Sequence, residues 1–202
     1  MKIITLSREF GSGGRELGKR LSDILGIDYY DSQIITEIAK EVNLDEKYVE
    51  NRLESNVFAN IPLSYASTFM VTPVNYDTPS LLTRQNKLIK EIPKRGDCII
   101  VGRAADSLLE EYHPFRIFVY ADMESKVKRC QERAEEDENL SVKELEKKIK
   151  TVDKRRSDVY EFVSLKEWGD KSSYDLCINT SGRDIKETAN SLAKYLETWL
   201  KD

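Results

Sequence analysis

The sequence predicts an α/β protein in which helices flank a parallel β-sheet. Short apolar runs, such as residues 2–6, 98–101 and 115–121, alternate with longer amphipathic segments. Strands that alternate with helices favour parallel pairing through right-handed crossovers. Four glycines also fall among the eight residues 11–18, directly after the first apolar run. A glycine-rich turn between a strand and a helix is typical of α/β folds that bind phosphate groups.

The individual elements follow from apolar runs, periodicity and capping residues. Residues 2–6 are apolar enough on both faces for a buried strand. Asp31 and Ser32 have the chemistry of a helix N-cap, and Ser141 with Glu144 matches a capping box. The other expected elements are a helix over about 13–25, a strand over 27–30, helices over 33–40, 44–54 and 80–94, strands over 98–101 and 115–121, helices over about 123–135 and 141–162, a strand over 174–179 and a helix over 184–200.

Composition narrows the class of protein. A chain of 202 residues suffices for one domain with a substantial core, and its net charge of −4 argues against broad binding of polymeric nucleic acid or of an anionic membrane. The three cysteines form no C-x-x-C pair and His113 is the only histidine, so neither a zinc site nor a disulfide framework is indicated. No apolar run approaches ~18 residues and no signal-peptide pattern is present, so we expect a cytoplasmic protein.

The glycine-rich turn carries the clearest chemistry. In residues 11–14, which read Gly-Ser-Gly-Gly, backbone N–H groups can converge on a phosphate at the positive end of the following helix. The P-loop pattern G-x-x-x-x-G-K-[ST] requires a lysine after its last glycine, but Gly13 is followed by Gly14 and Arg15. A tight turn with a purely structural role is the alternative interpretation.

Two charged residues follow the turn. In the phosphate-binding interpretation, Arg15 replaces the missing lysine as the cation, although its guanidinium is a planar fork and not a movable point charge. Glu16 takes the place of the magnesium-binding hydroxyl. It either coordinates Mg²⁺ directly or caps the helix, and the residues themselves do not distinguish the two roles.

Arginines later in the chain form the second candidate feature. Arg103 follows an apolar strand and a glycine, so we expect it in the cleft at the carboxyl ends of the strands, with a surface ion pair as the alternative. Arg129 and Arg133 lie four apart on one helix face, and Arg155 adjoins Arg156. Taken singly, each is more often a solvated helix residue. As a set, they are expected to place positive charge around a transferring phosphoryl group.

Four sequence blocks resemble the cytidylate kinase-like branch of the P-loop nucleoside monophosphate kinases. They are residues 4–16 (ITLSREFGSGGRE), 29–31 (YYD), 101–103 (VGR) and 174–181 (YDLCINTS). The resemblance implies a single three-layer P-loop kinase domain over residues 1–202, with a helical monophosphate-binding insertion and a helical lid. The implied parts are a core of about 1–30, 96–134 and 172–202, an insertion of about 31–95 and a lid of about 135–171.

The resemblance also implies a reaction. It points to ATP-dependent phosphoryl transfer, with Mg²⁺, to a nucleoside monophosphate of the CMP or dCMP kind or to a related small molecule. Asp31 and Ser32 match the start of the family's monophosphate site. Our hypothesis adds Arg103 and Arg84 as the residues that hold the acceptor. No protein ligand for a metal is assigned, and the oligomeric state, a homodimer included, is left open.

Departures from the family pattern keep other functions open. The family's G-K-G-T turn is absent, Gln33 stands for a glycine, and Ala104 stands for an acid. These changes affect both phosphate sites, so the fold is better supported than the substrate. One alternative is a nucleotide-binding or sensor protein that retains the kinase fold without catalysis. A second is a scaffold or interaction protein whose glycine turn is only structural.

Overall fold

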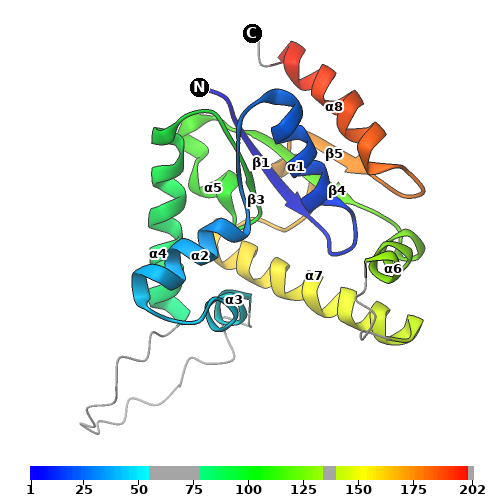
Figure 1. The fold of residues 1–202 in the computed structure, drawn as a ribbon, viewed down its shortest axis with the longest axis horizontal. Coiled ribbons are helices and arrows are strands. Elements are labelled where there is room, and N and C mark those ends of the chain that lie inside the picture. The colour runs from blue at the N-terminus through cyan, green and yellow to red at the C-terminus, as the bar shows by residue number, and fades with distance from the viewer. Residues whose placement is uncertain (55–77, 134–139, 200–202) are drawn as a thin grey trace, which may run out of the picture.

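The computed structural model describes residues 1–54, 78–133 and 140–199. Helices flank a five-stranded sheet in the order β2-β3-β1-β4-β5, and every pairing is parallel (Figure 1). This confirms the predicted fold class. The strands are β1 (Ile3–Arg8), β2 (Asp28–Tyr30), β3 (Cys98–Val101), β4 (Phe115–Tyr120) and β5 (Leu176–Asn179).

The described helices are close to the predicted ones. The segment expected over 80–94 is an α-helix followed by a 3₁₀ turn, η1 (Ile92–Arg95). The α-helices are α1 (Gly14–Leu25), α2 (Ser32–Val42), α3 (Glu46–Glu54), α4 (Thr78–Glu91), α5 (Ala105–Leu108), α6 (Met123–Glu132), α7 (Val142–Ser164) and α8 (Ile185–Trp199), and short 3₁₀ turns also occur at η2 (Glu110–Tyr112) and η3 (Lys171–Ser173).

β1 is the central strand, and its side chains alternate between two cores. Ile4 and Leu6 belong to the core under α1 and α8, whereas Ile3 belongs to the core that includes α2 and α4. All six residues of β1 are buried, because helices cover both faces of the sheet. A strand in that position is apolar on both faces, which explains why the sequence pattern identified it.

β1 is longer than the apolar run that predicted it. Ser7 pairs with Phe118 and Arg8 pairs with Val119, so the strand continues to Arg8 instead of ending at residue 6. The N–H of Glu9 then donates to the Val119 carbonyl at 3.0 Å. Ladder pairing with β4 therefore carries a serine and an arginine into the sheet, a feature that hydrophobic patterning does not detect.

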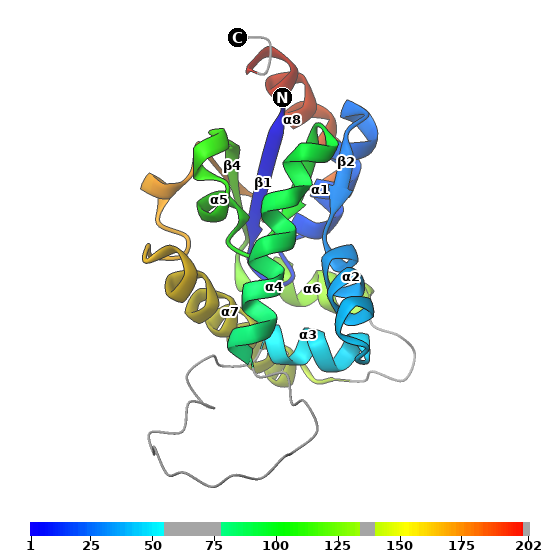
Figure 2. The ribbon, with the colours of Figure 1, turned by 90° about the vertical axis from the view of Figure 1, so that its left-hand side faces the viewer.

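The carboxyl ends of the parallel strands meet at one edge of the sheet, where ligands bind in folds of this class. Figures 1 and 2 show α7 crossing beneath this edge, α6 beside it, and the N-terminus at the opposite end. The helices α2, α3 and α4 gather on one side of the same edge. In the described residues, no helix combines the length and the apolar composition needed to cross a lipid bilayer.

One of the two predicted helix caps forms a capping hydrogen bond and the other does not. The capping box is present, because Ser141 Oγ accepts from the Glu144 N–H at 3.4 Å and the Glu144 carboxylate accepts from the Ser141 N–H at 2.8 Å. Asp31 occupies the N-cap position of α2, but its side chain makes no capping hydrogen bond. Its carboxylate instead pairs with arginines.

Replacing Leu17 by alanine should lower the free energy of unfolding by about 2–5 kcal/mol. Leu17 is 0% exposed in the core under α1 and α8, so truncation removes apolar contacts and leaves a cavity. Denaturant unfolding followed by circular dichroism measures the loss. Lys19→Ala on the same helix, where the side chain is 57% exposed, is the control and should change stability by less than about 0.5 kcal/mol. Equal losses in the two variants would contradict this packing.

Candidate active site

The glycine turn between β1 and α1 is tight and internally bonded. Gly11 and Gly13 have φ of 77° and 80°, in the left-handed region that favours glycine. Ser12 Oγ donates to the Glu9 carbonyl at 2.8 Å and accepts from the Gly14 N–H at 3.3 Å. A Cβ at Gly13 would also lie 2.5 Å from Ile185 Cδ1. The turn thus delivers the N-terminus of α1, with its outward-facing N–H groups, to the carboxyl edge of the sheet.

Arg129 of α6 supports this turn from outside. Its guanidinium donates to the Gly11 carbonyl at 3.4 Å, to the Arg183 carbonyl at 3.2 Å and to the Thr180 carbonyl. Thr180 Oγ1 donates to the Ser12 carbonyl at 2.7 Å. Burial, together with the nearby Arg133 charge, lowers the pKa of Arg129. Arg129 therefore fixes the turn to the segment between β5 and α8.

A buried lysine joins the turn to the long helix α7. Lys126 Nζ lies 2.6 Å from the Glu9 carboxylate and 3.2 Å from that of Asp153, and the Lys126 side chain is only 7% exposed. The other Asp153 oxygen accepts from the Phe10 N–H at 2.6 Å. Burial raises the pKa of Asp153 despite these partners. The ion triad Glu9–Lys126–Asp153 thus connects the residue after β1 to α6 and α7.

Glu16, in the first turn of α1, pairs with two arginines. Its carboxylate accepts from Arg20 Nε at 2.7 Å and from the Arg133 guanidinium. As an acid in the first turn of α1, Glu16 also interacts favourably with the helix dipole, whereas its role as a magnesium ligand stays a prediction. The contact with Glu16 places Arg133 beside α1.

Asp31, at the end of β2, is a buried acid between two arginines. Arg15 Nε lies 2.5 Å from one carboxylate oxygen, although the Arg15 side chain is 60% exposed. Arg8 lies 3.7 Å from the other oxygen, and the Arg8 side chain is 9% exposed. The pair with Arg15 explains why this carboxylate does not cap α2.

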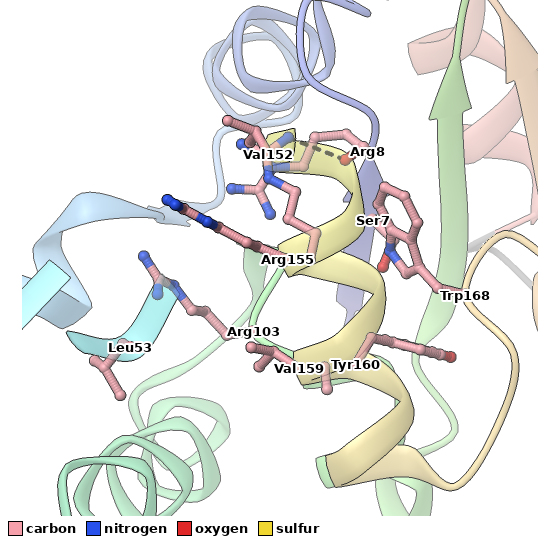
Figure 3. A pocket seen from close by; sticks show the side chains of 12 residues that line it. Ser7, Arg8, Leu53, Arg103, Val152, Arg155, Val159, Tyr160 and Trp168 are labelled. Atoms are coloured by element: carbon pink, nitrogen blue, oxygen red, sulfur yellow. Dashed lines mark hydrogen bonds between the residues drawn. The ribbon is translucent and has the colours of Figure 1, made fainter. Parts of the chain in front are cut away.

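A cavity at the ends of β1 and β3 collects arginines from separate segments (Figure 3). Arg103 and Arg155 extend in the same direction, while Trp168 stands beside Ser7 on the opposite side. Arg156 donates to the Arg8 carbonyl at 3.2 Å. The cavity is lined by Ser7, Arg8, Leu53, Gly102, Arg103, Ala104, Val152, Arg155, Arg156, Val159, Tyr160 and Trp168. It therefore offers a cationic part for an anion and an apolar part for a ring or a base.

The backbone after β3 is strained at the point where it presents Arg103. Gly102, Arg103 and Ala104 all have positive φ, of 72°, 63° and 51°. For residues other than glycine this conformation costs of order 1–3 kcal/mol each. The Gly102 N–H donates to the Leu6 carbonyl at 2.9 Å, which fastens the strained turn to β1. Such strain, held by surrounding structure, is characteristic of functional sites.

Tyr160 connects α7 to the segment that follows β3. Its hydroxyl donates to Asp106 Oδ2 at 2.7 Å, and both residues are buried. Burial raises the pKa of Asp106, and the Tyr160 hydrogen bond opposes that shift. This contact places the Arg155 and Arg156 segment of α7 over the cavity.

The structure brings together some of the predicted site residues and separates others. Arg103, Arg155 and Arg156 line the cavity, and Asp31 lies next to it through Arg8. Of the described residues, the lining set does not include Arg84, which pairs with Glu41 between α4 and α2. Ser32 is exposed at the start of α2. The part of the expected insertion over 55–77 lies outside the described residues.

Sequence reasoning missed Arg8 and the ion triad. Arg8 precedes the glycine turn, whereas the P-loop pattern places its cation after the last glycine. A charged residue between an apolar run and a glycine turn is nevertheless a usable signal, since strand ends in parallel sheets face the ligand. No sequence signal distinguishes Lys126 or Asp153, because each lies in a helical segment that contains many other charged residues.

The site fits a polyphosphate better than it fits a metal held by the protein. The N-terminus of α1 and the cavity arginines both favour an anion. Among residues 1–54, 78–133 and 140–199, no three His, Cys, Asp or Glu side chains group to hold a metal ion. Glu16 would serve as a ligand only by giving up its arginine contacts.

Comparisons with known proteins identify a family and a fold. The cytidylate kinase-like family matches residues 3–182. A cytidylate kinase of Staphylothermus marinus is 24% identical over the full length of both chains. An uncharacterized protein from Eubacterium ventriosum has a TM-score of 0.70 at 24% identity, covering 98% of this chain and 99% of that one. A shikimate kinase from Acinetobacter baumannii, in complex with shikimate, has a TM-score of 0.58 at 16% identity, covering 98% and 94%. The fold is thus the P-loop kinase fold.

Tyr160→Phe should lower the free energy of unfolding by about 1–3 kcal/mol at neutral pH, because it leaves the buried Asp106 carboxylate without its hydroxyl partner. Denaturant unfolding measures the loss.

The pH dependence of that loss tests the cause. The pKa of Asp106 is raised in the folded protein, so its charged form costs stability above that pKa and the protonated form relieves the cost as the pH falls. The loss caused by Tyr160→Phe should therefore shrink at acidic pH. Asp106→Asn keeps an acceptor for the tyrosine without the charge and should cost less than Tyr160→Phe at neutral pH. A loss that does not depend on pH would contradict a charged Asp106 as its cause.

Proposed function

The chain belongs to the cytidylate kinase-like family, and we propose that it transfers the γ-phosphoryl group of ATP to a nucleoside monophosphate of the CMP or dCMP kind or to a related small molecule. Family and fold support phosphoryl transfer to a nucleotide or small molecule in general. The observation that carries the proposal is the arginine-lined cavity beside the glycine turn. The similarity to a cytidylate kinase makes CMP the first acceptor to test.

The two phosphate groups would occupy adjoining parts of the site. We assign the donor phosphates to residues 11–16, where the helix N-terminus favours negative charge. We assign the acceptor phosphate to Arg103, with its ring against the apolar part of the cavity at Val159 and Trp168. We retain the division into core, insertion and lid as part of this proposal, with α7 in the lid.

Transfer would need little covalent help from the protein. An oxygen of the acceptor phosphate forms a bond to the γ-phosphorus, and the bond to the β–γ bridging oxygen breaks, so that ADP leaves with the electron pair. Arg155 and Arg156 would neutralise the charge on the transferring group. Arg129 and Arg133 would hold the turn and α1 in position through the contacts described above. Mg²⁺ would arrive bound to the ATP phosphates.

A second function is favoured by one observation. The lysine of the P-loop pattern is absent, since Gly14 follows Gly13. A protein that binds ATP as a sensor without transferring phosphate would tolerate that loss. Calorimetry with ATP alongside a turnover assay separates the two functions, because tight binding without turnover is expected only for the sensor.

A coupled assay for ADP release, run over a panel of nucleoside monophosphates with ATP and Mg²⁺, should detect turnover with at least one acceptor. Background rates with every acceptor would contradict the kinase proposal.

Arg155→Met should lower kcat by about 10³-fold or more, as loss of a transition-state arginine does. Lys154→Met is the matched control on the same helix, because Lys154 is 71% exposed and paired with Asp158. It should leave kcat unchanged.

A further inference from the structure

Compared with the P-loop pattern, this chain has a cation where the pattern has its first glycine, and a glycine where the pattern has its lysine. In G-x-x-x-x-G-K-[ST], the first glycine lies five positions before the last one and the lysine follows directly after it. With Gly13 as the last glycine, the first position falls on Arg8 and the lysine position falls on Gly14. α1 begins at Gly14, where the pattern would start its helix.

The packing shows that the two exchanged residues depend on each other. A Cβ added at Gly14 would lie 2.6 Å from Arg8 Cβ and 3.1 Å from its Cγ, closer than real side chains approach. Gly14 is the first helical residue, so the turn does not require glycine there for its conformation. The absent side chain instead leaves room for the stem of Arg8.

A second glycine makes room for the other end of the same side chain. A Cβ added at Gly102 would lie 1.7 Å from Arg8 Nη1 and 2.8 Å from its Cζ. The Arg8 guanidinium therefore lies directly against the backbone at the end of β3. The Arg8 side chain thus packs against Gly14 with its stem and against Gly102 with its guanidinium.

The charge around Arg8 calls for an anion. Its pKa is lowered, first by burial and then by the charge of Arg156, with further contributions from Arg103 and Arg15. Asp31 opposes this, but at 3.7 Å the contact is an ion pair and not a hydrogen bond. Asp31 is also shared with Arg15, at 2.5 Å. Asp31 is thus divided between Arg8 and Arg15, and the Arg8 guanidinium keeps N–H groups that a phosphate could accept from.

We propose that Arg8 binds the terminal phosphate of the nucleoside triphosphate, supplying from the end of β1 the cation that a lysine supplies from the start of the helix in the ordinary pattern. This inference rests on the proposed function. Arg8 lines the cavity with Arg103 and Arg155, and its own backbone leads into the glycine turn. Its planar fork can hold two oxygens of one phosphate, unlike the single ammonium of a lysine. Arg15, the cation expected from the sequence, then acts from the exposed side.

Calorimetry with Mg²⁺–ATP and with inorganic tripolyphosphate tests the assignment. Arg8→Met should weaken binding of both probes about 10- to 100-fold, since it removes hydrogen bonds from a charged donor. The apo variant should melt no lower than the wild type, because a buried cation among cations is lost. Arg116→Met, which also removes an arginine from an aspartate at 2.8 Å but at the start of β4, is the matched control and should bind ATP as the wild type does.

The reciprocal variant gives a second and independent measurement. Gly14→Lys alone should lower the melting temperature through its clash with Arg8. The double variant Arg8→Gly/Gly14→Lys restores the ordinary pattern and should bind ATP more tightly than either single variant. A folded Arg8→Met protein with wild-type affinity would overturn the assignment. If Arg8→Met does not fold, a folded double variant that binds no better than Gly14→Lys overturns it instead.

ATP binding by the wild-type protein distinguishes a failure of the Arg8 assignment from a failure of the proposed function. If the wild type shows no calorimetric binding of ATP, both the proposed function and the role of Arg8 are overturned. If the wild type binds ATP and Arg8→Met binds equally well, the kinase proposal stands and only the assignment to Arg8 fails.

Discussion

The site depends on several positively charged arginine side chains being held close together. Arg8, Arg103 and Arg156 converge at the carboxyl edge of the sheet, and the carboxylate recorded beside Arg8 is that of Asp31. Arg8 is buried and Arg103 and Arg156 are half-buried, so repulsion among them lowers stability and the surrounding structure has to impose the arrangement. A binding surface that is unfavourable when empty becomes favourable when an anion enters. The energetic cost of the free protein is thereby recovered as affinity.

The surrounding structure imposes this arrangement through bonds between segments that are distant in the chain. The Glu9–Lys126–Asp153 triad and the Tyr160–Asp106 bond tie α7 to the residue after β1, to α6 and to the turn after β3. Arginines also donate to backbone carbonyls, as Arg129 does around the glycine turn. Carbonyl acceptors satisfy a guanidinium without adding a negative charge that would compete for the other cations. The site thus stays positive while these bonds hold its framework together.

Sequence reasoning recovered the sheet because its central strands are built mainly from apolar residues, as in residues 98–101. It placed Arg103 at the cavity because a residue after a strand and a glycine must lie at the carboxyl edge. It could not place Arg84, since the packing of α4 on α2 determines the contact with Glu41. It missed Arg8 because the search for a cation began after the last glycine. The Arg8 side chain fills the space beside Gly14, and the packing shows this contact whereas the sequence pattern does not.

The contact between Arg8 and Gly14 has an evolutionary consequence. A chain with this arrangement cannot reach the ordinary P-loop by one substitution, because a lysine at Gly14 would clash with the stem of Arg8 and a glycine at Arg8 leaves no cation at that position. With the role proposed for Arg8, either intermediate would be impaired, and the two changes would be strongly epistatic. Lineages that adopted one version would tend to keep it, and the two versions of the phosphate-binding turn would diverge as separate branches of one fold.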